Sequence, residues 1–165
     1  MRVYIPATSS VLRRMLEAEA VEPAPLTAFA VTPALREWYV DDNVEELEYA
    51  AMLEAARASL RLLDADPDAA RRRVVIAADV SDSDVTVRDD LDRGVVRVAA
   101  PVPLAAIASV HMDDAEAEPI VAAAAEAIIA ADLGDATAQE RVDDAEGFEL
   151  AWYANQEVRD LLAGL

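Results

Sequence analysis

Hydrophobic and polar positions along the chain predict short strands alternating with helices. Runs rich in β-branched residues, bounded by proline or polar residues, predict strands at Val3–Ile5, Thr27–Val31, Val74–Ala78, Val95–Val98, Ile107–Met112 and Phe148–Tyr153. The run Val74–Ala78 is apolar throughout, which is typical of a strand inside a sheet. Val85 and Val87, followed by Asp92-Arg93-Gly94, predict a hairpin that ends in Val95–Val98.

Two long helices are predicted. Asn43 with Glu46 three residues later resembles a capping box and opens a helix over Val44–Leu63, whose apolar residues recur at three- and four-residue spacing in a wide stripe. Acidic residues and Pro119 open a second helix over Asp114–Asp132. Shorter helices are expected after Thr8-Ser9-Ser10, after Thr32-Pro33, and from Asn155 to Leu162.

These elements predict one α+β domain over residues 1–165, with no linker that would divide it. We expect a two-layer sandwich in which a mixed β-sheet of five or six strands carries the helices Val44–Leu63 and Asp114–Asp132 packed on one face. A ferredoxin-like topology is one version of this arrangement. Strand order does not follow from the pattern.

Charge and composition narrow the function classes. The 165 residues include 33 acids, 14 basic residues that are all arginine, and no cysteine, for a net charge of −19. The acid excess disfavours binding to nucleic acid or to anionic membranes, and the lack of cysteine removes thiol chemistry. The apolar stretch Ile120–Leu133 is too short to span a membrane, and no secretory signal is visible, so we expect a cytoplasmic protein.

One group of residues has metal-ligand chemistry. His111, the single histidine, stands close to Asp113 and Asp114 at a predicted strand–helix junction. The other interpretation is a histidine at the end of a strand beside a capping aspartate. Asp79, Asp82 and Asp84 could hold a cation but do not match a calcium loop, and the run Arg71–Arg73 is either a phosphate clamp or a solvated edge. The four glycines exclude the common nucleotide-binding loops, and no cofactor is expected.

Two Trp-Tyr dipeptides, Trp38-Tyr39 and Trp152-Tyr153, either line a ligand groove or subunit contact or cover the core. With no recognisable catalytic motif, we expect a non-enzymatic binding or regulatory module that acts through protein contacts. The alternative is a small metal-dependent hydrolase that uses His111 with Asp113 or Asp114. The broad apolar surface of the helix Asp114–Asp132 also suggests a homodimer.

Four segments resemble a family of uncharacterised actinobacterial proteins: Met1–Thr8, Ala28–Tyr39, Glu45–Ala51 and Ala151–Glu157. The resemblance spans nearly the whole chain. It implies a single-domain protein from a G+C-rich source, and it brings no activity or catalytic residue, because the family has only a domain-of-unknown-function label. The chain departs from the expected pattern at Gly147-Phe148, where we expect a histidine in many relatives.

Overall fold

The computed structural model describes residues 1–40 and 42–165. Seven strands form one antiparallel sheet in the order β5-β6-β3-β1-β4-β8-β9. The strands are β1 (Arg2–Ala7), β3 (Leu26–Phe29), β4 (Val74–Asp79), β5 (Val85–Val87), β6 (Val95–Val98), β8 (Ile107–Met112) and β9 (Ala151–Ala154). A separate pair joins β2 (Ala20–Val21) to β7 (Val102–Pro103). The α+β sandwich expected from the sequence is confirmed.

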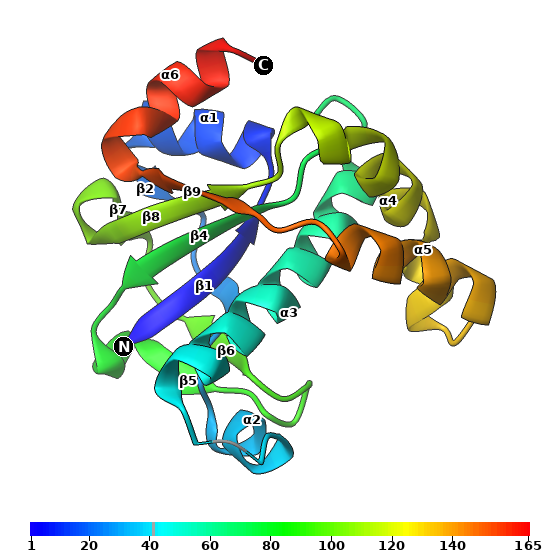
Figure 1. Cartoon of the computed structure of the whole chain (residues 1–165). Helices are drawn as coiled ribbons and strands as arrows, with labels where there is room; N and C mark the ends of the chain where they lie inside the picture. Colours follow the sequence, from blue (N-terminus) through cyan, green and yellow to red (C-terminus); the bar gives the residue numbers. More distant parts are fainter. Residues whose placement is uncertain (41) are drawn as a thin grey trace.

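The longest helix, α3 (Val44–Ala65), lies on one face of the sheet (Figure 1). Its N-terminus is capped by Asn43, whose side chain accepts hydrogen bonds from the backbone N–H groups of Glu45 and Glu46. Small residues on its inner side, including Ala51 and Ala55, allow a close approach to the alternating residues of β1, β3 and β4 that face it. We call this side of the sheet the α3 face.

The opposite face is also covered. α1 (Ser9–Ala18) and α6 (Val158–Ala163) bury their apolar sides against the other set of alternating strand residues. Thr8 caps α1, as expected. Helices therefore cover both faces of the sheet, whereas the sequence predicted helices on one face. The ferredoxin-like topology, which was one version of that prediction, is not observed in the described residues. The structure also differs in parallelism, because every described pairing is antiparallel. Strands apolar on both sides need cover on both sides.

α4 (Glu118–Asp132) and α5 (Ala136–Glu146) form a lobe beside the sheet, at the right of Figure 1. α4 packs against the C-terminal half of α3 and against α5, in a cluster that includes Leu60, Val121, Ile128 and Val142. The two long helices thus contact each other, but α4 does not join α3 on the sheet. The wide apolar surface of α4 is thus buried within the chain, because α5 covers a side of the helix that the sheet does not contact.

The short helix α2 (Pro33–Trp38) begins at Thr32, whose side chain accepts a hydrogen bond from the Leu35 N–H. The described residues also form four 3₁₀ turns: η1 (Asp82–Asp84), η2 (Leu104–Ala106), η3 (Ala115–Ala117) and η4 (Asn155–Glu157). The last of these replaces the first turn of the predicted C-terminal helix. Asn155 does not cap that helix, because its side-chain amide donates to the carbonyl of Leu104.

Candidate functional site

His111 lies on β8, and its side chain is on the α3 face of the sheet. It is directly opposite Val75 on β4 and Trp152 on β9. Ser109, two residues earlier on the same strand, therefore faces the same side. The Ser109 hydroxyl and the His111 Nε2 atom are 3.0 Å apart. The strand thus presents a hydrogen-bonded Ser–His pair to the space beside α3.

The electrostatic surroundings of His111 favour the uncharged imidazole. Burial lowers the pKa of His111 below its ordinary value, and the positive charge of nearby Arg2 lowers it further. Since the ordinary value is about 6.5, the side chain is neutral at pH 7. It can act as a hydrogen-bond acceptor or as a proton acceptor in that form.

Asp113 does not join His111. Its carboxylate is fully buried and accepts three hydrogen bonds from Arg73: from the Arg73 backbone N–H at 2.8 Å, from Nε at 2.8 Å and from Nη2 at 2.7 Å. Asp114 is exposed and precedes the 3₁₀ turn η3. The sequence pattern His111-x-Asp113-Asp114 is therefore divided between a sheet-face histidine, a buried ion pair and an exposed turn residue.

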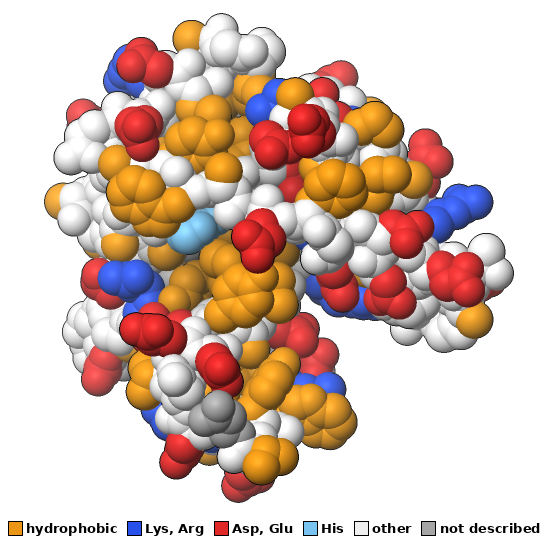
Figure 2. Space-filling model, viewed as in Figure 1, with side chains coloured by type: hydrophobic (Ala, Val, Ile, Leu, Met, Phe, Trp, Pro, Cys, Tyr) orange, Lys and Arg blue, Asp and Glu red, His pale blue; other side chains and the backbone are white. Residues whose placement is uncertain are grey.

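A cleft of about 320 Å³ opens in front of the Ser–His pair, between α3 and the sheet. We call it the α3–sheet cleft. In Figure 2 the single histidine is visible at the surface with hydrophobic side chains next to it and acidic side chains close by. The cleft is lined by residues of β1, α3, β4, β8 and β9, namely Arg2, Tyr4, Glu45, Glu48, Tyr49, Met52, Ala77, Ser109, His111 and Trp152.

The charged groups of the cleft leave an excess of negative charge. Arg2 is paired with Asp79, with an Nε–Oδ1 distance of 2.7 Å and an Nη2–Oδ2 distance of 3.0 Å. Glu48 accepts a hydrogen bond of 2.9 Å from the Tyr4 hydroxyl, and burial together with this contact raises the pKa of Tyr4. Glu45 is exposed at the rim. Because Asp79 neutralises Arg2 and His111 is uncharged, Glu45 and Glu48 make the electrostatic potential in the cleft negative.

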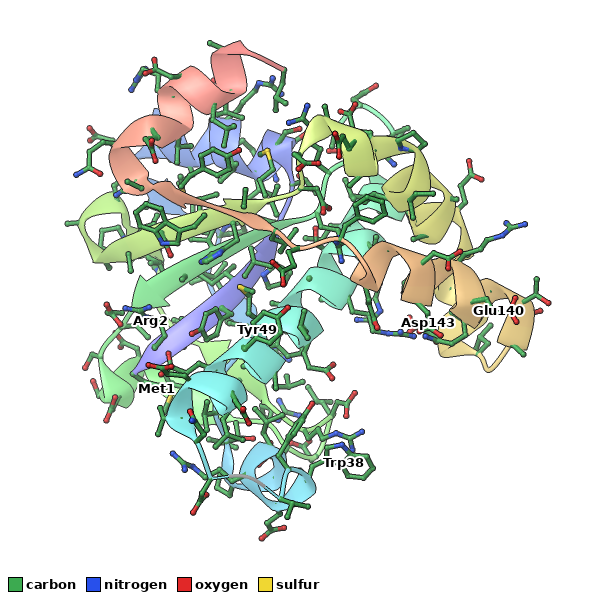
Figure 3. All side chains as sticks on the ribbon, in the orientation of Figure 1. Met1, Arg2, Trp38, Tyr49, Glu140 and Asp143 are labelled. Carbon is green, nitrogen blue, oxygen red and sulfur yellow. The ribbon has the colours of Figure 1, made fainter. Side chains whose placement is uncertain are left out.

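The two Trp-Tyr dipeptides have different environments. Trp152 lines the α3–sheet cleft, whereas Tyr153 points to the other face of the sheet and packs on the core there. Trp38 lies on α2, away from the cleft (Figure 3), and the guanidinium carbon of Arg93 lies 3.6 Å from the centre of its ring. Tyr39 borders a neighbouring groove on the far side of Tyr49. The structure thus brings only Trp152 to the histidine.

Cation ligands do not gather at the places that the sequence suggested. Asp79 is paired with Arg2, and Asp82 with the amino group of Met1 at 2.9 Å. Among residues 1–40 and 42–165, no group of three or more His, Asp or Glu side chains is arranged to hold a metal ion.

The run Arg71–Arg73 is used inside the protein. Arg71 donates to the carbonyls of Leu63 and Asp66 at the C-terminal end of α3 and to that of Ala69 in the turn that follows. Arg72 pairs with Glu118 at 3.0 Å, and Arg73 with Asp113. Arg71 closes the end of α3, Arg72 joins the segment before β4 to the start of α4, and Arg73 joins it to the end of β8. The three side chains do not form a phosphate clamp.

The model of a family of unknown function, DUF6912, matches residues 1–162. The chain belongs to this family. The resemblance to a domain of unknown function is thereby confirmed over nearly the whole length. No curated protein and no solved structure matches the chain. In the part of the chain that the structure describes, no helix is both long and apolar enough to cross a membrane.

Family membership assigns no role to any side chain, so the site rests on geometry. Sequence reasoning singled out His111 and Trp152 but missed Arg2, Tyr4, Glu48 and Ser109. Tyr49 and Met52 fall within the wide apolar stripe that the sequence predicts for the helix Val44–Leu63. The available signal was the spacing of Glu45, Glu48, Tyr49 and Met52, which places them on one side of the helix, and the alternation of Ser109 with His111.

Proposed function

We propose that this protein is a non-enzymatic binding module that holds a positively charged segment of a partner protein in the α3–sheet cleft. The observation that carries the proposal is the combination of exposed aromatic rings, Trp152 and Tyr49, with the carboxylates of Glu45 and Glu48 around one cleft. Aromatic faces and carboxylates both attract a guanidinium or ammonium group. Such a group could lie over a ring while it pairs with a glutamate.

The charge of the whole chain supports a cationic partner. A net charge of −19 attracts basic segments over long distances and repels phosphate backbones. Within the cleft the one arginine is already paired with Asp79, so it does not oppose a cation strongly. The expected absence of nucleic-acid binding and the cytoplasmic location stay predictions.

The protein contains an internal example of the proposed contact. Trp38 and Trp152 are 62% and 61% exposed, and Arg93 lies over the ring of Trp38. No arginine of residues 1–40 or 42–165 lies over the ring of Trp152. An arginine from a partner could therefore make with Trp152 the cation–π contact that Arg93 makes with Trp38.

Calorimetric titration with the peptide acetyl-Arg-Val-Arg-Val-Arg-amide tests the proposal. We expect binding that weakens as salt is added, and at least about tenfold weaker binding of the citrulline counterpart, which has the same shape without the charge. Trp152→Ala should weaken binding at least about fivefold. Trp38→Ala is the matched control and should leave binding unchanged.

A charge-matched pair of variants separates a specific site from general attraction. Glu45→Gln with Glu48→Gln removes two charges at the cleft and keeps the acceptor for the Tyr4 hydroxyl. Glu140→Gln with Asp143→Asn removes two charges on α5, far from the cleft in Figure 3. The cleft variant should bind the peptide at least about tenfold more weakly than the α5 variant. Equal weakening by both would contradict a site in the cleft.

A hydrolase is the second candidate, favoured by the Ser109–His111 contact of 3.0 Å at the cleft. His111 would work with Ser109, since Arg73 occupies the carboxylate of Asp113. In that reaction the Ser109 oxygen attacks an ester carbonyl, the hydroxyl proton passes to Nε2 of His111 and then to the leaving alcohol, and water releases the acid. Turnover of p-nitrophenyl acetate that disappears in both Ser109→Ala and His111→Gln would establish this function. Equal turnover in the wild-type protein and both variants would exclude it.

A further inference from the structure

The outer edge of β9 is open. β9 is the last strand of the sheet. Among residues 1–40 and 42–165 it pairs only with β8, so one of its sides has no neighbouring strand in this part of the chain. Exposed strand edges are usually blunted by lysine, proline or a bulge, because they accept strands from other chains. The four residues Ala151–Ala154 contain no lysine and no proline. This edge therefore lacks the lysine and the proline that often block strand pairing.

The direction of the backbone groups of β9 follows from one hydrogen bond. The N–H of Ala154 donates to the carboxylate of Glu157 at 2.7 Å, so it points away from β8. Outward and inward groups alternate along an antiparallel strand, and Trp152 is two residues earlier. The N–H and C=O of Trp152 therefore also point outward. Neither has a hydrogen-bond partner among residues 1–40 and 42–165.

The same alternation places the side chain of Trp152 beside the cleft. Trp152 is directly opposite His111, in the kind of pair whose two side chains approach most closely. Ala151 and Ala154 are small and do not hinder an approach to the edge. The exposed carboxylates of Glu149 and Glu157 flank the two ends of the strand. The edge is thus narrow, acidic at both ends and continuous with the α3–sheet cleft.

We infer that the partner segment binds as an extended strand that pairs with the outer edge of β9 through the backbone N–H and C=O of Trp152. The inference rests on the proposed function and adds how the segment is held. Alternate side chains of an added strand project to the same face. Basic residues at every second position would therefore lie on the α3 face, next to Trp152 and Glu48.

Two N-methylated forms of acetyl-Arg-Val-Arg-Val-Arg-amide test the pairing. One is methylated at the backbone nitrogens of the arginines and the other at those of the valines. Only one set of N–H groups faces β9 in an added strand, so one methylated form should bind at least about tenfold more weakly than the other. Equal binding by both methylated forms would overturn strand addition.

Hydrogen exchange of the Trp152 backbone amide is the second measurement. Saturation with the unmethylated peptide should slow its exchange at least about tenfold. The amide of Val87 is the internal control. Val87 is on the other edge strand, β5. The N–H of the next residue, Arg88, donates to the carbonyl of Val95, and that of Ala99, after β6, donates to the carbonyl of Asp84. By alternation the amide of Val87 points outward. Its exchange should not change.

The outcomes distinguish binding in the cleft from strand addition at β9. Binding that depends on Trp152 and the cleft glutamates, with unchanged exchange of the Trp152 amide, would leave the proposed function standing and overturn the strand addition. Absence of binding by the unmethylated peptide would overturn both. Slowed exchange at Trp152 alone, with unequal binding of the methylated forms, supports both.

Discussion

The guanidinium of Arg73 and the carboxylate of Asp113 form a bidentate ion pair in which the side chains are 2% and 0% exposed. Arg73 precedes β4 and Asp113 follows β8, so the pair joins the two strands where both leave the sheet. Nη2 of Arg73 also donates to the carbonyl of Phe148 at 3.0 Å, which ties in the segment before β9. One buried pair therefore positions three neighbouring segments of the sheet.

Asp113→Ala should lower the free energy of unfolding by about 3–5 kcal/mol, because it leaves the Arg73 charge buried without a partner. Arg73→Met combined with Asp113→Leu should recover most of that loss, since no charge then remains buried. Urea denaturation followed by circular dichroism measures both. A single variant that costs less than about 1 kcal/mol would show that water reaches the pair.

The pH dependence of stability should contain a contribution from His111. Burial and the charge of Arg2 lower its pKa, so the unfolded chain binds this proton more readily than the folded chain. The free energy of unfolding should therefore fall as the pH drops below about 6.5, and this loss should end below the folded pKa. His111→Gln should remove this contribution. Denaturation curves of both proteins at about pH 7.5 and about pH 5.5 test this. If the free energies of unfolding of wild type and variant differ by the same amount at both pH values, the assignment to His111 is contradicted.

Asp89 should be important for the position of α2. Its carboxylate accepts hydrogen bonds from the Thr32 hydroxyl at 2.6 Å and from the backbone N–H groups of Ala34 and Gly94, each at 3.1 Å. Asp89→Ala should lower the free energy of unfolding by about 1–2 kcal/mol. Asp90→Ala is the control, because Asp90 is exposed and pairs only locally with Arg88. Equal effects of the two variants in thermal denaturation would contradict this role.

Added salt should stabilise the protein. A net charge of −19 on one domain produces self-repulsion, which sodium chloride screens. The melting temperature should therefore rise between low and about molar salt. Calorimetric scans that stay flat over this range would show that the charges are already dispersed or paired.

Light scattering at micromolar concentration should give a mass near 17.7 kDa. The homodimer expected from the sequence depended on an uncovered apolar side of α4, and α3 and α5 cover most of that side within the chain. Two large apolar residues stay exposed here: Ile129 on α4 and Leu133 just after its last residue. A mass near twice this value across a tenfold dilution would support the homodimer instead.

The local pattern of the chain was sufficient to predict most elements. Asn43 and the three- and four-residue spacing that follows it predicted α3, and the apolar run Val74–Ala78 predicted the interior strand β4. α5 was missed, because it is mostly polar. Its buried residues are Ala138, Val142 and Ala145, and this narrow stripe is buried only because α4 lies beside it. Helix propensity and caps act over a few residues, so they can be read from the sequence.

The candidate site was decided by tertiary structure. His111 and Trp152 were identified from the sequence, but their partners Arg2, Glu48 and Tyr49 come from β1 and α3, far away along the chain. Asp113, two residues from His111, instead pairs with Arg73, forty positions earlier. By itself the sequence determined most of the helices and strands, the acidic charge and the lack of thiol chemistry. Strand order determined which side chains meet, because pairing across the sheet depends on long-range packing that no local pattern specifies.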